Sequence, residues 1–297
     1  MSVHTPSLDH PYQNLTGGQW LRGNLHTHTV ATDGKQTLQE VIDDYAGRGY
    51  DFLMISDHDI LTGAKEYDAH DPKGMILIPG NEISSRGCHM LHVNADRLVE
   101  GHADRQQTIN EVNDSQGFII VNHPNWGKNF NHCSIDQLVE WDSYVGIEIY
   151  NGVIEFLEGS PYAMNKWDML LTLGHRAWGF ANDDSHYKEG NVAQGWNVAY
   201  VADRRADSIA AALQQGRFYA STGMKITKIQ TDGRQIHIEA DYAEEIRAIC
   251  DNGQQFQVAD GPSIETQVPD DATYVRFECL GHGDCFAWTQ PFFVVAD

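Results

Sequence analysis

Short apolar runs alternate with amphipathic segments along the first two-thirds of the chain. The apolar runs cover 52–56, 75–80, 117–121, 146–150, 177–181 and 196–201. They are short and apolar nearly throughout, which is typical of strands that are covered on both faces. Strands of this kind, separated by helical segments, predict β/α units around a parallel sheet.

Five segments between these runs predict helices. In 37–49, Thr37 and Glu40 have the spacing of a capping box, and glycines end the pattern. The apolar residues of this segment recur at helical spacing, at Leu38, Val41, Ile42 and Tyr45. The other predicted helices cover 104–116, 134–141, 160–173 and 205–215.

The pattern changes after about Gly223. Apolar and polar residues then alternate over 225–242, 246–258 and 273–295, with Asp-Gly and Asn-Gly turn signals. Alternation with period two predicts antiparallel strands, so we expect a small β unit packed on the main domain. The predicted division is a domain of residues 1–222 followed by a β domain of residues 223–297.

The charge of the chain narrows the choice of partners. Its 297 residues include 42 acidic and 20 basic side chains, a formal net charge of -22. Such a surface repels phosphate backbones, which disfavours binding to extended nucleic acid. No run is apolar enough to span a membrane, and we see no secretory signal. Five cysteines without a CxxC pair indicate reduced thiols in a cytoplasmic protein. The sequence does not indicate an oligomeric state.

Nearly every predicted strand ends in a side chain that can bind a metal ion. In a parallel barrel these ends converge on one mouth. The strand-end residues are His26, His28, Asp57, His58, Asp59, Glu82, His92, His123, Asp183, Asp184 and His186. Each has an ordinary alternative, since a strand-end histidine is often satisfied in the core and an aspartate often caps a helix. Their number is the signal, because so many strand ends of one kind exceed chance.

The chemistry of this set favours a catalytic metal site. Imidazoles and carboxylates without thiolates suit Mn²⁺, Fe²⁺ or Zn²⁺ and do not resemble a structural zinc knot. Asp33 follows His28 closely and joins the candidates. The candidate ligands are too many for one ion, and they suit two or three.

Six motifs occur in a characteristic order along the chain: HTHTVATDG, SDHD, PGNEIS, HMLHV, NHP and DDSH. Together they resemble the PHP (polymerase and histidinol phosphatase) superfamily, over roughly residues 20–222. The resemblance implies an α/β fold, a distorted (β/α)7 barrel with a trinuclear metal site at its mouth. The β unit that follows resembles the branch that includes carbaryl-hydrolase-like proteins.

The resemblance also implies a ligand group for each ion. The first ion would be held by His26, His28, Glu82 and Asp184. Glu82 would bridge to the second ion, which would also be held by His92 and His123. The third ion would be held by Asp33, His58 and His186.

Three of these positions leave alternatives. Asp33 stands where some family members have histidine, which predicts a weaker third ion. Within CHMLH either His89 or His92 can be the ligand, and the apolar pattern that continues after His92 favours His92. Asp183 is expected to support the ligands from behind or to serve as a cap, while Asp184 is the ligand.

The predicted chemistry is hydrolysis. Two or three ions close together lower the pKa of a bridging water to roughly 7 or 8, which gives hydroxide at neutral pH. Three residues are predicted to be catalytic: Glu82, Asp184 and His186. The predicted substrate contacts are Arg86 and Lys128, which could clamp a phosphate, and His89, which with His132 could transfer a proton. Arg86 and Lys128 could equally be solvated loop charges, and loop histidines such as His89 and His132 are more often inert. Trp126 could stack on a substrate or pack its loop.

We therefore expect a metal-dependent phosphoesterase that acts on a small phosphate ester, with a monoester or short nucleotide favoured. Its cofactors would be two or three divalent ions of Mn, Fe or Zn. One alternative is a hydrolase of a carboxylic ester, amide or carbamate, because the same ions would serve those carbonyl groups. A further alternative is a metal-binding module without turnover.

Overall fold

The computed structural model describes residues 7–187, 191–283 and 285–295. Residues 1–6, which belong to the N-terminal segment that lacks the pattern of a secretory signal, lie outside this range. Five helices confirm the predicted helical segments: α1 (Leu38–Gly47), α3 (Arg105–Asn113), α4 (Ile135–Glu140), α5 (Met164–Thr172) and α6 (Ala206–Gln214). None of the described helices is long and apolar enough to cross a membrane.

The start of α1 shows why the sequence signal was sufficient. The backbone N–H of Glu40 donates to Thr37 Oγ1 at 3.4 Å, and the backbone N–H of Thr37 donates to Glu40 Oε2 at 2.8 Å. This reciprocal capping box satisfies two N–H groups that a helix start would leave unpaired. Shorter helical elements add α2 (Ala64–Tyr67) and the 3-10 turns η1 (Gly152–Phe156) and η2 (Asp251–Gly253).

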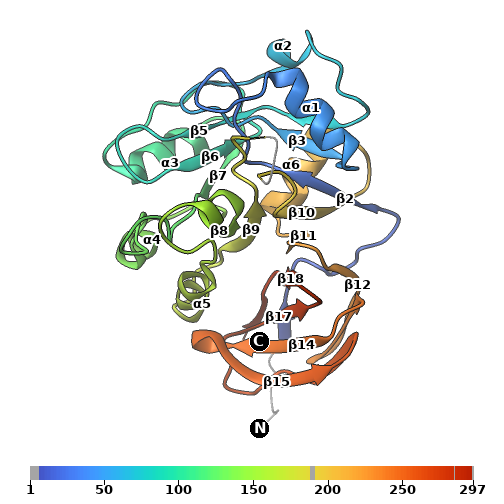
Figure 1. Ribbon diagram of the computed structural model, residues 1–297. Coiled ribbons are helices and arrows are strands. Elements are labelled where there is room, and N and C mark those ends of the chain that lie inside the picture. The colour runs from blue at the N-terminus through green and yellow to red at the C-terminus, as the bar shows by residue number, and fades with distance from the viewer. Residues whose placement is uncertain (1–6, 188–190, 284, 296–297) are drawn as a thin grey trace.

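Two arcs of strands form the part of the structure that carries α1 to α6 (Figure 1). The first arc follows the order β4 (Ile76–Ile78), β3 (Phe52–Met54), β2 (Gln19–Asn24), β10 (Trp196–Val201) and β11 (Phe218–Ser221). The second arc follows the order β5 (Gly80–Ile83), β6 (Met90–Val93), β7 (Phe118–Val121), β8 (Gly146–Asn151) and β9 (Trp178–Asn182). One buried cluster draws Phe52, Phe118 and Phe180 from both arcs, so the arcs share a core.

This arrangement differs from the expected (β/α)7 barrel of parallel strands. The pairs β2–β10, β10–β11, β5–β6 and β6–β7 are antiparallel. Ile83 and Met90 are joined without a helix, and a short connection can only return antiparallel. Isolated parallel bridges, Thr27 to Ser185 and His58 to Glu82, link the arcs at one end.

The C-terminal unit, residues 223–295, is built from antiparallel pairs, as the alternating pattern predicts. Its strands are β12 (Lys225–Asp232), β13 (Gln235–Asp241), β14 (Glu245–Cys250), β15 (Gln254–Asp260), β16 (Ser263–Gln267), β17 (Tyr274–Leu280), β18 (Phe286–Thr289) and β19 (Phe292–Val295). Its resemblance to carbaryl-hydrolase-like proteins stays a prediction.

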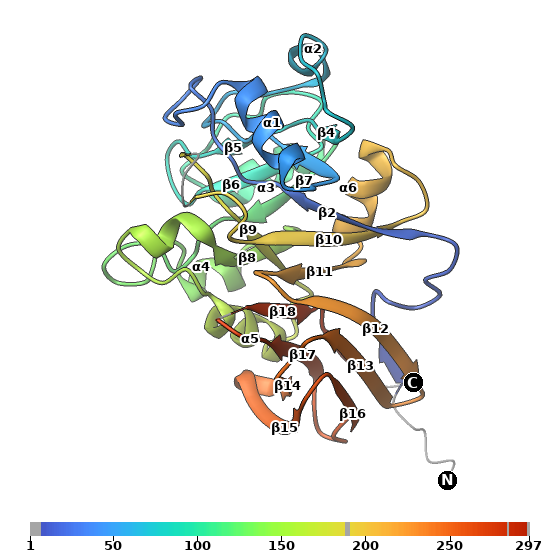
Figure 2. The same cartoon turned by 45° about the vertical axis from the view of Figure 1, so that its right-hand side comes forward.

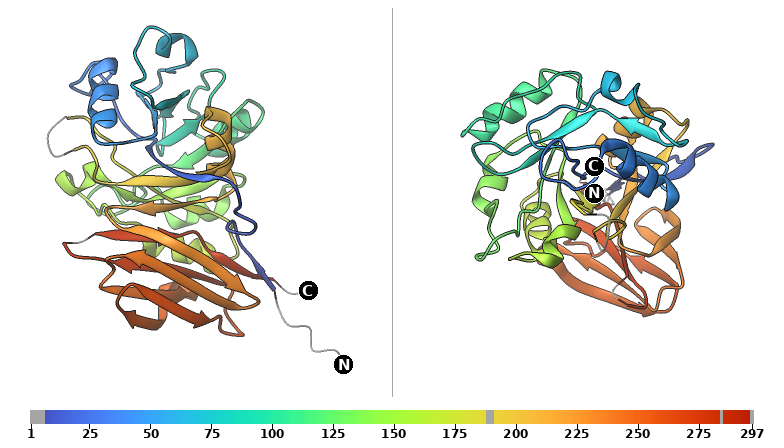
Figure 3. Two further views of the ribbon diagram at one scale, coloured as in Figure 1. Left: turned by 90° about the vertical axis from the view of Figure 1, so that its right-hand side faces the viewer. Right: turned by 45° about the horizontal axis from the view of Figure 1, so that its top comes forward.

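The predicted boundary at 222/223 crosses a continuous sheet. Strand β11 pairs with β18, which lies directly beneath it in Figure 2. In addition, β1 (Ser7–Asp9) pairs with β19, so these early residues pack on the C-terminal unit. Figure 3 shows the segment after β1 running along the molecule to the upper arcs.

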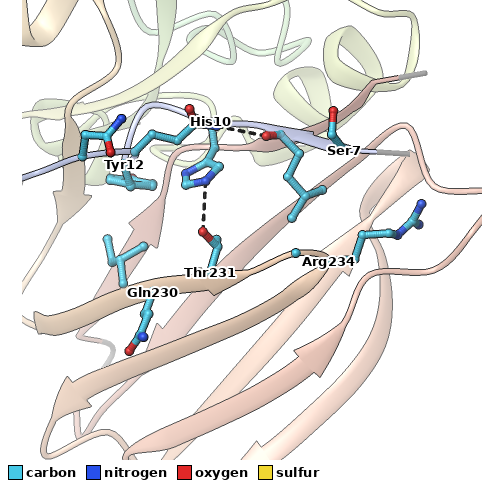
Figure 4. Close-up of a pocket in the computed structure, with 11 residues that line it drawn as sticks. Ser7, His10, Tyr12, Gln230, Thr231 and Arg234 are labelled. Atoms are coloured by element: carbon cyan, nitrogen blue, oxygen red, sulfur yellow. Dashed lines mark hydrogen bonds between the residues drawn. The ribbon is translucent and has the colours of Figure 1, made fainter. Parts of the chain in front are cut away.

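The segment after β1 is fixed to β12 by His10. Its Nε2 atom shares a hydrogen bond of 3.3 Å with Thr231 Oγ1, and its ring lies 4.8 Å from that of Phe292. Burial lowers the pKa of His10 to about 4, so the ring packs in its neutral form at pH 7. Figure 4 shows His10 and Thr231 facing each other in an open hollow of about 650 Å³.

A buried ion pair joins α5 to β17. Arg276, which is 1% exposed, donates from Nε and Nη2 to the two carboxylate oxygens of Asp168, both at 2.7 Å. Its Nη1 atom donates to Glu278 at 2.8 Å, and the Tyr274 hydroxyl donates to Asp168 at 2.8 Å. A bidentate, fully desolvated pair of this kind depends on both partners.

We expect Asp168→Ala to lower the free energy of unfolding by about 3–5 kcal/mol, because Arg276 would keep its buried charge with one carboxylate partner fewer. Urea denaturation followed by circular dichroism measures the change. Lys73→Ala, which removes an exposed ion pair with Asp71, is the control and should change stability by less than about 1 kcal/mol. Equal effects of the two substitutions would contradict this role.

Candidate metal centre

Nine imidazole and carboxylate side chains gather at the end of the arcs where the bridges link them. Most come from residues at or just after the ends of β2, β3, β5, β7 and β9. The set, which we call the ligand cluster, is His26, His28, Asp33, His58, Glu82, His89, His123, Asp184 and His186. The expectation that polar strand ends would converge is thus met for eight of the nine predicted ligands.

Glu82 lies at the centre of the ligand cluster and is completely buried. Its carboxylate oxygens contact ring nitrogens of five histidines: His58 at 2.7 Å, His89 at 3.2 Å, His26 at 3.3 Å, His123 at 3.4 Å and His28 at 3.6 Å. Asn122 Nδ2 also donates to it at 2.6 Å. A carboxylate in the middle of so many ligand atoms would serve as a ligand to ions bound among them.

Asp184 forms the second carboxylate centre. Its Oδ1 atom lies 3.0 Å from His28 Nε2 and 3.2 Å from His26 Nε2. The backbone is strained here, with φ of 53° at Asp184 and 27° at His123. Positive φ is uncommon outside glycine and costs energy, and it is often found where a side chain must be aimed.

Asp33 marks the outer edge of the ligand cluster. Its Oδ2 atom lies 3.3 Å from His186 Nε2 and 3.4 Å from His58 Nε2. Its side chain is 54% exposed, whereas those of Glu82 and Asp184 are 1% and 6% exposed. Of the three carboxylates in the ligand cluster, that of Asp33 is therefore the most open to solvent.

The buried atoms of the ligand cluster fit divalent metal ions. His26 Nε2, His28 Nε2 and Glu82 Oε2 are buried and make no hydrogen bond among the described residues. Leaving such atoms unpaired costs roughly 1–3 kcal/mol each, and a cation among them would satisfy all three. Nitrogen and oxygen donors of this kind suit Mn²⁺, Fe²⁺ or Zn²⁺.

Two rings are oriented for ligation through Nε2. His26 donates from Nδ1 to Glu148 Oε1 at 2.8 Å, and His186 donates from Nδ1 to the backbone oxygen of Asp184 at 2.8 Å. A proton held at Nδ1 leaves the Nε2 lone pair free, which is the usual arrangement of histidine ligands.

The pKa shifts report the same demand for positive charge. Burial alone would lower the pKa of His26, but the carboxylates of Asp184, Glu148 and Glu82 outweigh burial and raise it well above its ordinary value. Burial alone would raise the pKa of Glu82, but the rings of His26 and His89 outweigh burial and hold this pKa well below its ordinary value. Metal ions would replace the protons that these groups attract, so metal binding releases protons.

Glu148 is a supporting residue that the sequence motifs did not single out. It lies on β8 and is 1% exposed. Besides His26, it accepts the backbone N–H of His123 at 2.8 Å and the side-chain amides of Asn151 at 2.8 Å and Asn182 at 2.9 Å. An acidic residue inside the apolar run 146–150 was the signal that could have found it.

His92 does not reach the ligand cluster, and His89 stands in its place. On the antiparallel pair β5–β6, His92 lies opposite Asn81, the neighbour of Glu82. Adjacent strand residues face opposite sides, so His92 points away from Glu82 and donates to the backbone oxygen of Gln116 at 3.0 Å. His89 precedes β6, in the turn, and contacts Glu82.

The expected phosphate clamps also lie elsewhere. Arg86 is exposed and is absent from the lining of the cavity described below. The side chain of Lys128 is 79% exposed and pairs with Glu158 at 3.6 Å. Both charges sit on solvated loops, which is the alternative that the sequence left open.

His132 and Asp183 have structural contacts. His132 Nε2 accepts the backbone N–H of His89 at 3.0 Å, and burial together with His123 and His89 lowers its pKa to about 3. Its ring is therefore neutral at pH 7 and holds His89 in place. Asp183 accepts the Tyr45 hydroxyl at 2.7 Å and three backbone N–H groups of residues 193–195, as expected for a supporting residue.

A cavity of about 170 Å³ opens onto the ligand cluster. It is lined by Asp33, His58, Glu82, His89, His123, Trp126, Val153, Ile154, Leu157, Asp184 and His186. The cavity thus brings seven members of the ligand cluster within reach of a small molecule.

Comparison with solved structures identifies the fold. The chain is similar to a two-domain protein from Bacteroides vulgatus described as containing a predicted PHP-like metal-dependent phosphoesterase, with a TM-score of 0.56 and 15% identity. The match covers 95% of this chain and 89% of that chain. The chain has a PHP-like fold. This likeness extends over both the two arcs and the C-terminal unit.

Two further structures align less well with this chain. A proposed metal-dependent phosphoesterase from Bifidobacterium adolescentis has 16% identity, covers 65% of this chain and 96% of its own, and gives a TM-score of 0.46. An amidohydrolase from Chromobacterium violaceum has 15% identity, and the match covers 57% of this chain and 89% of that chain with a TM-score of 0.43. Neither adds to the fold assignment.

Sequence comparisons are narrower. No protein-family model matches the chain. A curated 5'-3' exoribonuclease from Haemophilus influenzae is 34% identical over 79 residues, which are 25% of this chain and 29% of that enzyme. The chain therefore spans less than a third of the length of this relative.

The two histidines of the CHMLH motif make a matched test. We expect His89→Gln to weaken Mn²⁺ binding by roughly 10-fold or more, because it removes a ring nitrogen beside Glu82. His92→Gln should leave binding unchanged, since its ring faces away. Calorimetric titration of both variants measures the difference, and a greater loss in His92→Gln would restore the original assignment.

Glu148→Gln tests the supporting layer. We expect Mn²⁺ affinity to fall by about 10–100-fold, because the ring of His26 loses the carboxylate that orients it. The control is Glu140→Gln at the exposed end of α4, which should bind as the unchanged protein does. Unaltered affinity in a folded Glu148→Gln variant would show that His26 needs no such support.

Proposed function

We propose that this protein is a metal-dependent phosphoesterase that hydrolyses a small phosphate ester with two or three divalent ions of Mn, Fe or Zn. The observation that carries the proposal is the buried Glu82 carboxylate in contact with five histidines. The PHP-like fold supports it, as does a relative named as an exoribonuclease, since ribonucleases cleave phosphate esters. The net charge of -22 favours a small substrate over extended nucleic acid.

Three groups of side chains would hold the ions. The first group is His26, His28, Glu82 and Asp184. The second group is Glu82, His89 and His123. The third group is Asp33, His58 and His186. Glu82 is shared by the first two, and the open third group is the one we expect to bind its ion most weakly.

Bound ions of this kind lower the pKa of a coordinated water and neutralise charge on substrate oxygens. The chain itself supplies position. Glu148 fixes His26, and Asn122 fixes Glu82, so both groups keep their places while a substrate enters from the cavity. The described lining contains no lysine or arginine, so the described residues of the cavity offer the phosphate no charged clamp.

That same absence favours a second candidate, hydrolysis of a carboxylic ester, amide or carbamate. A neutral substrate needs no charged clamp, and a carbonyl oxygen can be polarised by the same ions. The two candidates differ in product. Only the phosphoesterase releases phosphate or a new phosphomonoester.

The first experiment is hydrolysis of p-nitrophenyl phosphate and bis-p-nitrophenyl phosphate by the Mn²⁺-loaded protein. We expect activity on at least one of them, its loss on treatment with a chelator and its return with Mn²⁺. Glu82→Gln should reduce the rate to background while the fold is retained, because the bridging carboxylate is gone. The preferred substrate divides a monoesterase from a diesterase.

Two outcomes would count against the proposal. A Glu82→Gln variant with an undiminished rate would remove Glu82 from the centre of the chemistry. If neither phosphate ester is hydrolysed while elemental analysis confirms bound metal, the result would favour the second candidate. Aryl carbamates and carboxylic esters would then be assayed on the same preparation.

A further inference from the structure

The cavity beside the ligand cluster has two unlike halves. One half is formed by members of the ligand cluster. The other half is entirely apolar or aromatic and consists of Trp126, Val153, Ile154 and Leu157. At about 170 Å³ the cavity is below the usual range of about 300–1,000 Å³ for drug-sized ligands. A substrate that reaches the ligand cluster must therefore be small and must also lie against the apolar half.

Backbone contacts hold the apolar half in place. It comes from the loop 123–133 and the segment 152–160, which are joined by a bridge between Trp126 and Gly159. The backbone N–H of Gly127 donates to the oxygen of Glu158 at 2.8 Å, and that of Ser160 donates to Asn125 at 3.1 Å. The two segments thus form one wall, to which one segment contributes Trp126 and the other Leu157.

The ring of Trp126 is a fixed part of this wall. Its ring centre lies 5.0 Å from that of His132, 5.2 Å from that of His123 and 5.7 Å from that of His89. Two of these histidines belong to the ligand cluster. The indole therefore keeps a set position relative to the groups that would bind the ions.

The outer margin of the wall exposes apolar surface. Leu157 is 50% exposed and its neighbour Phe156 is 63% exposed, while Val153 and Ile154 are buried at the inner end. Large apolar side chains that stay in contact with water beside a cavity commonly mark a ligand-binding surface. No lysine or arginine is among the described residues that line this cavity.

We propose that the group esterified to the substrate phosphate is apolar, an aryl or compact branched alkyl group that packs between Trp126 and Leu157. This inference rests on the proposed function and adds the substrate class. The phosphate faces the ligand cluster, and the apolar group displaces water from Trp126, Ile154 and Leu157. A sugar or second phosphate in the same place would lose hydrogen bonds to water without finding partners in the wall.

Two non-hydrolysable phosphonates isolate the contribution of the apolar half. Methylphosphonate and phenylphosphonate carry the same dianionic head and differ only in the group that would meet the wall. For the Mn²⁺-loaded protein, we expect phenylphosphonate to bind on the order of 10-fold more tightly, because the ring buries additional apolar area. Calorimetric titration measures both affinities, and competitive inhibition of p-nitrophenyl phosphate hydrolysis checks that they share the active site.

A matched pair of leucine variants locates the preference. Leu157→Asn should reduce the ratio of the two affinities at least several-fold while methylphosphonate still binds. Leu98→Asn, at a leucine that is 47% exposed and absent from the cavity lining, should leave the ratio as it was. A ratio that is insensitive to Leu157→Asn would overturn the placement of the apolar group.

The remaining outcomes separate this inference from the function on which it rests. Equal affinities, together with release of phosphate from p-nitrophenyl phosphate, would overturn the apolar substrate class and leave the phosphoesterase standing. Failure of both phosphonates to bind, with no phosphate ester hydrolysed by metal-loaded protein, would overturn the two proposals together.

Discussion

A fully buried carboxylate that touches five histidine rings needs positive charge beside it, and the surrounding structure serves that need. Burying an ion without a compensating charge costs free energy, and the side chain of Glu82 is shielded from solvent. The bridge between His58 and Glu82 and the strained backbone of Asp184 bring charged groups from distant strands to the same place. The two arcs thus hold in place the charged side chains that surround Glu82.

The asparagines behind the ligands orient the buried carboxylates without adding charge. Asn122 donates to Glu82, while Asn151 and Asn182 donate to Glu148. Amides orient a carboxylate without adding a charge to a site that already holds several. Aspartates at these positions would repel the groups that they now hold, so the choice of amide over acid is part of the electrostatics.

Sequence patterns predicted what depends on neighbouring residues. The box of Thr37 and Glu40 and the apolar runs are local, and they located helices and strands well. The choice of His92 was wrong because the pattern could not show that β6 begins at Met90, which places His89 in the connection before the strand and directs His92 away from Glu82. The antiparallel pairs within the arcs depend on the path that each connection takes between strands, which the pattern of a single strand does not show. The pairing of Asp168 with Arg276 joins residues 108 positions apart, which no local pattern records.

The pairing of β1 with β19 has a consequence for biosynthesis. Leu8 lies opposite Val294, and the Tyr12 hydroxyl bonds both to Phe218 and to Gln290. On the ribosome, these early residues must wait until residues 290–295 have emerged before their partners exist. Closing so long a loop is slow, and apolar side chains such as Leu8 stay uncovered meanwhile. The contacts that Leu8 and Tyr12 make with the C-terminal unit therefore form late, with partners that are translated hundreds of positions afterwards.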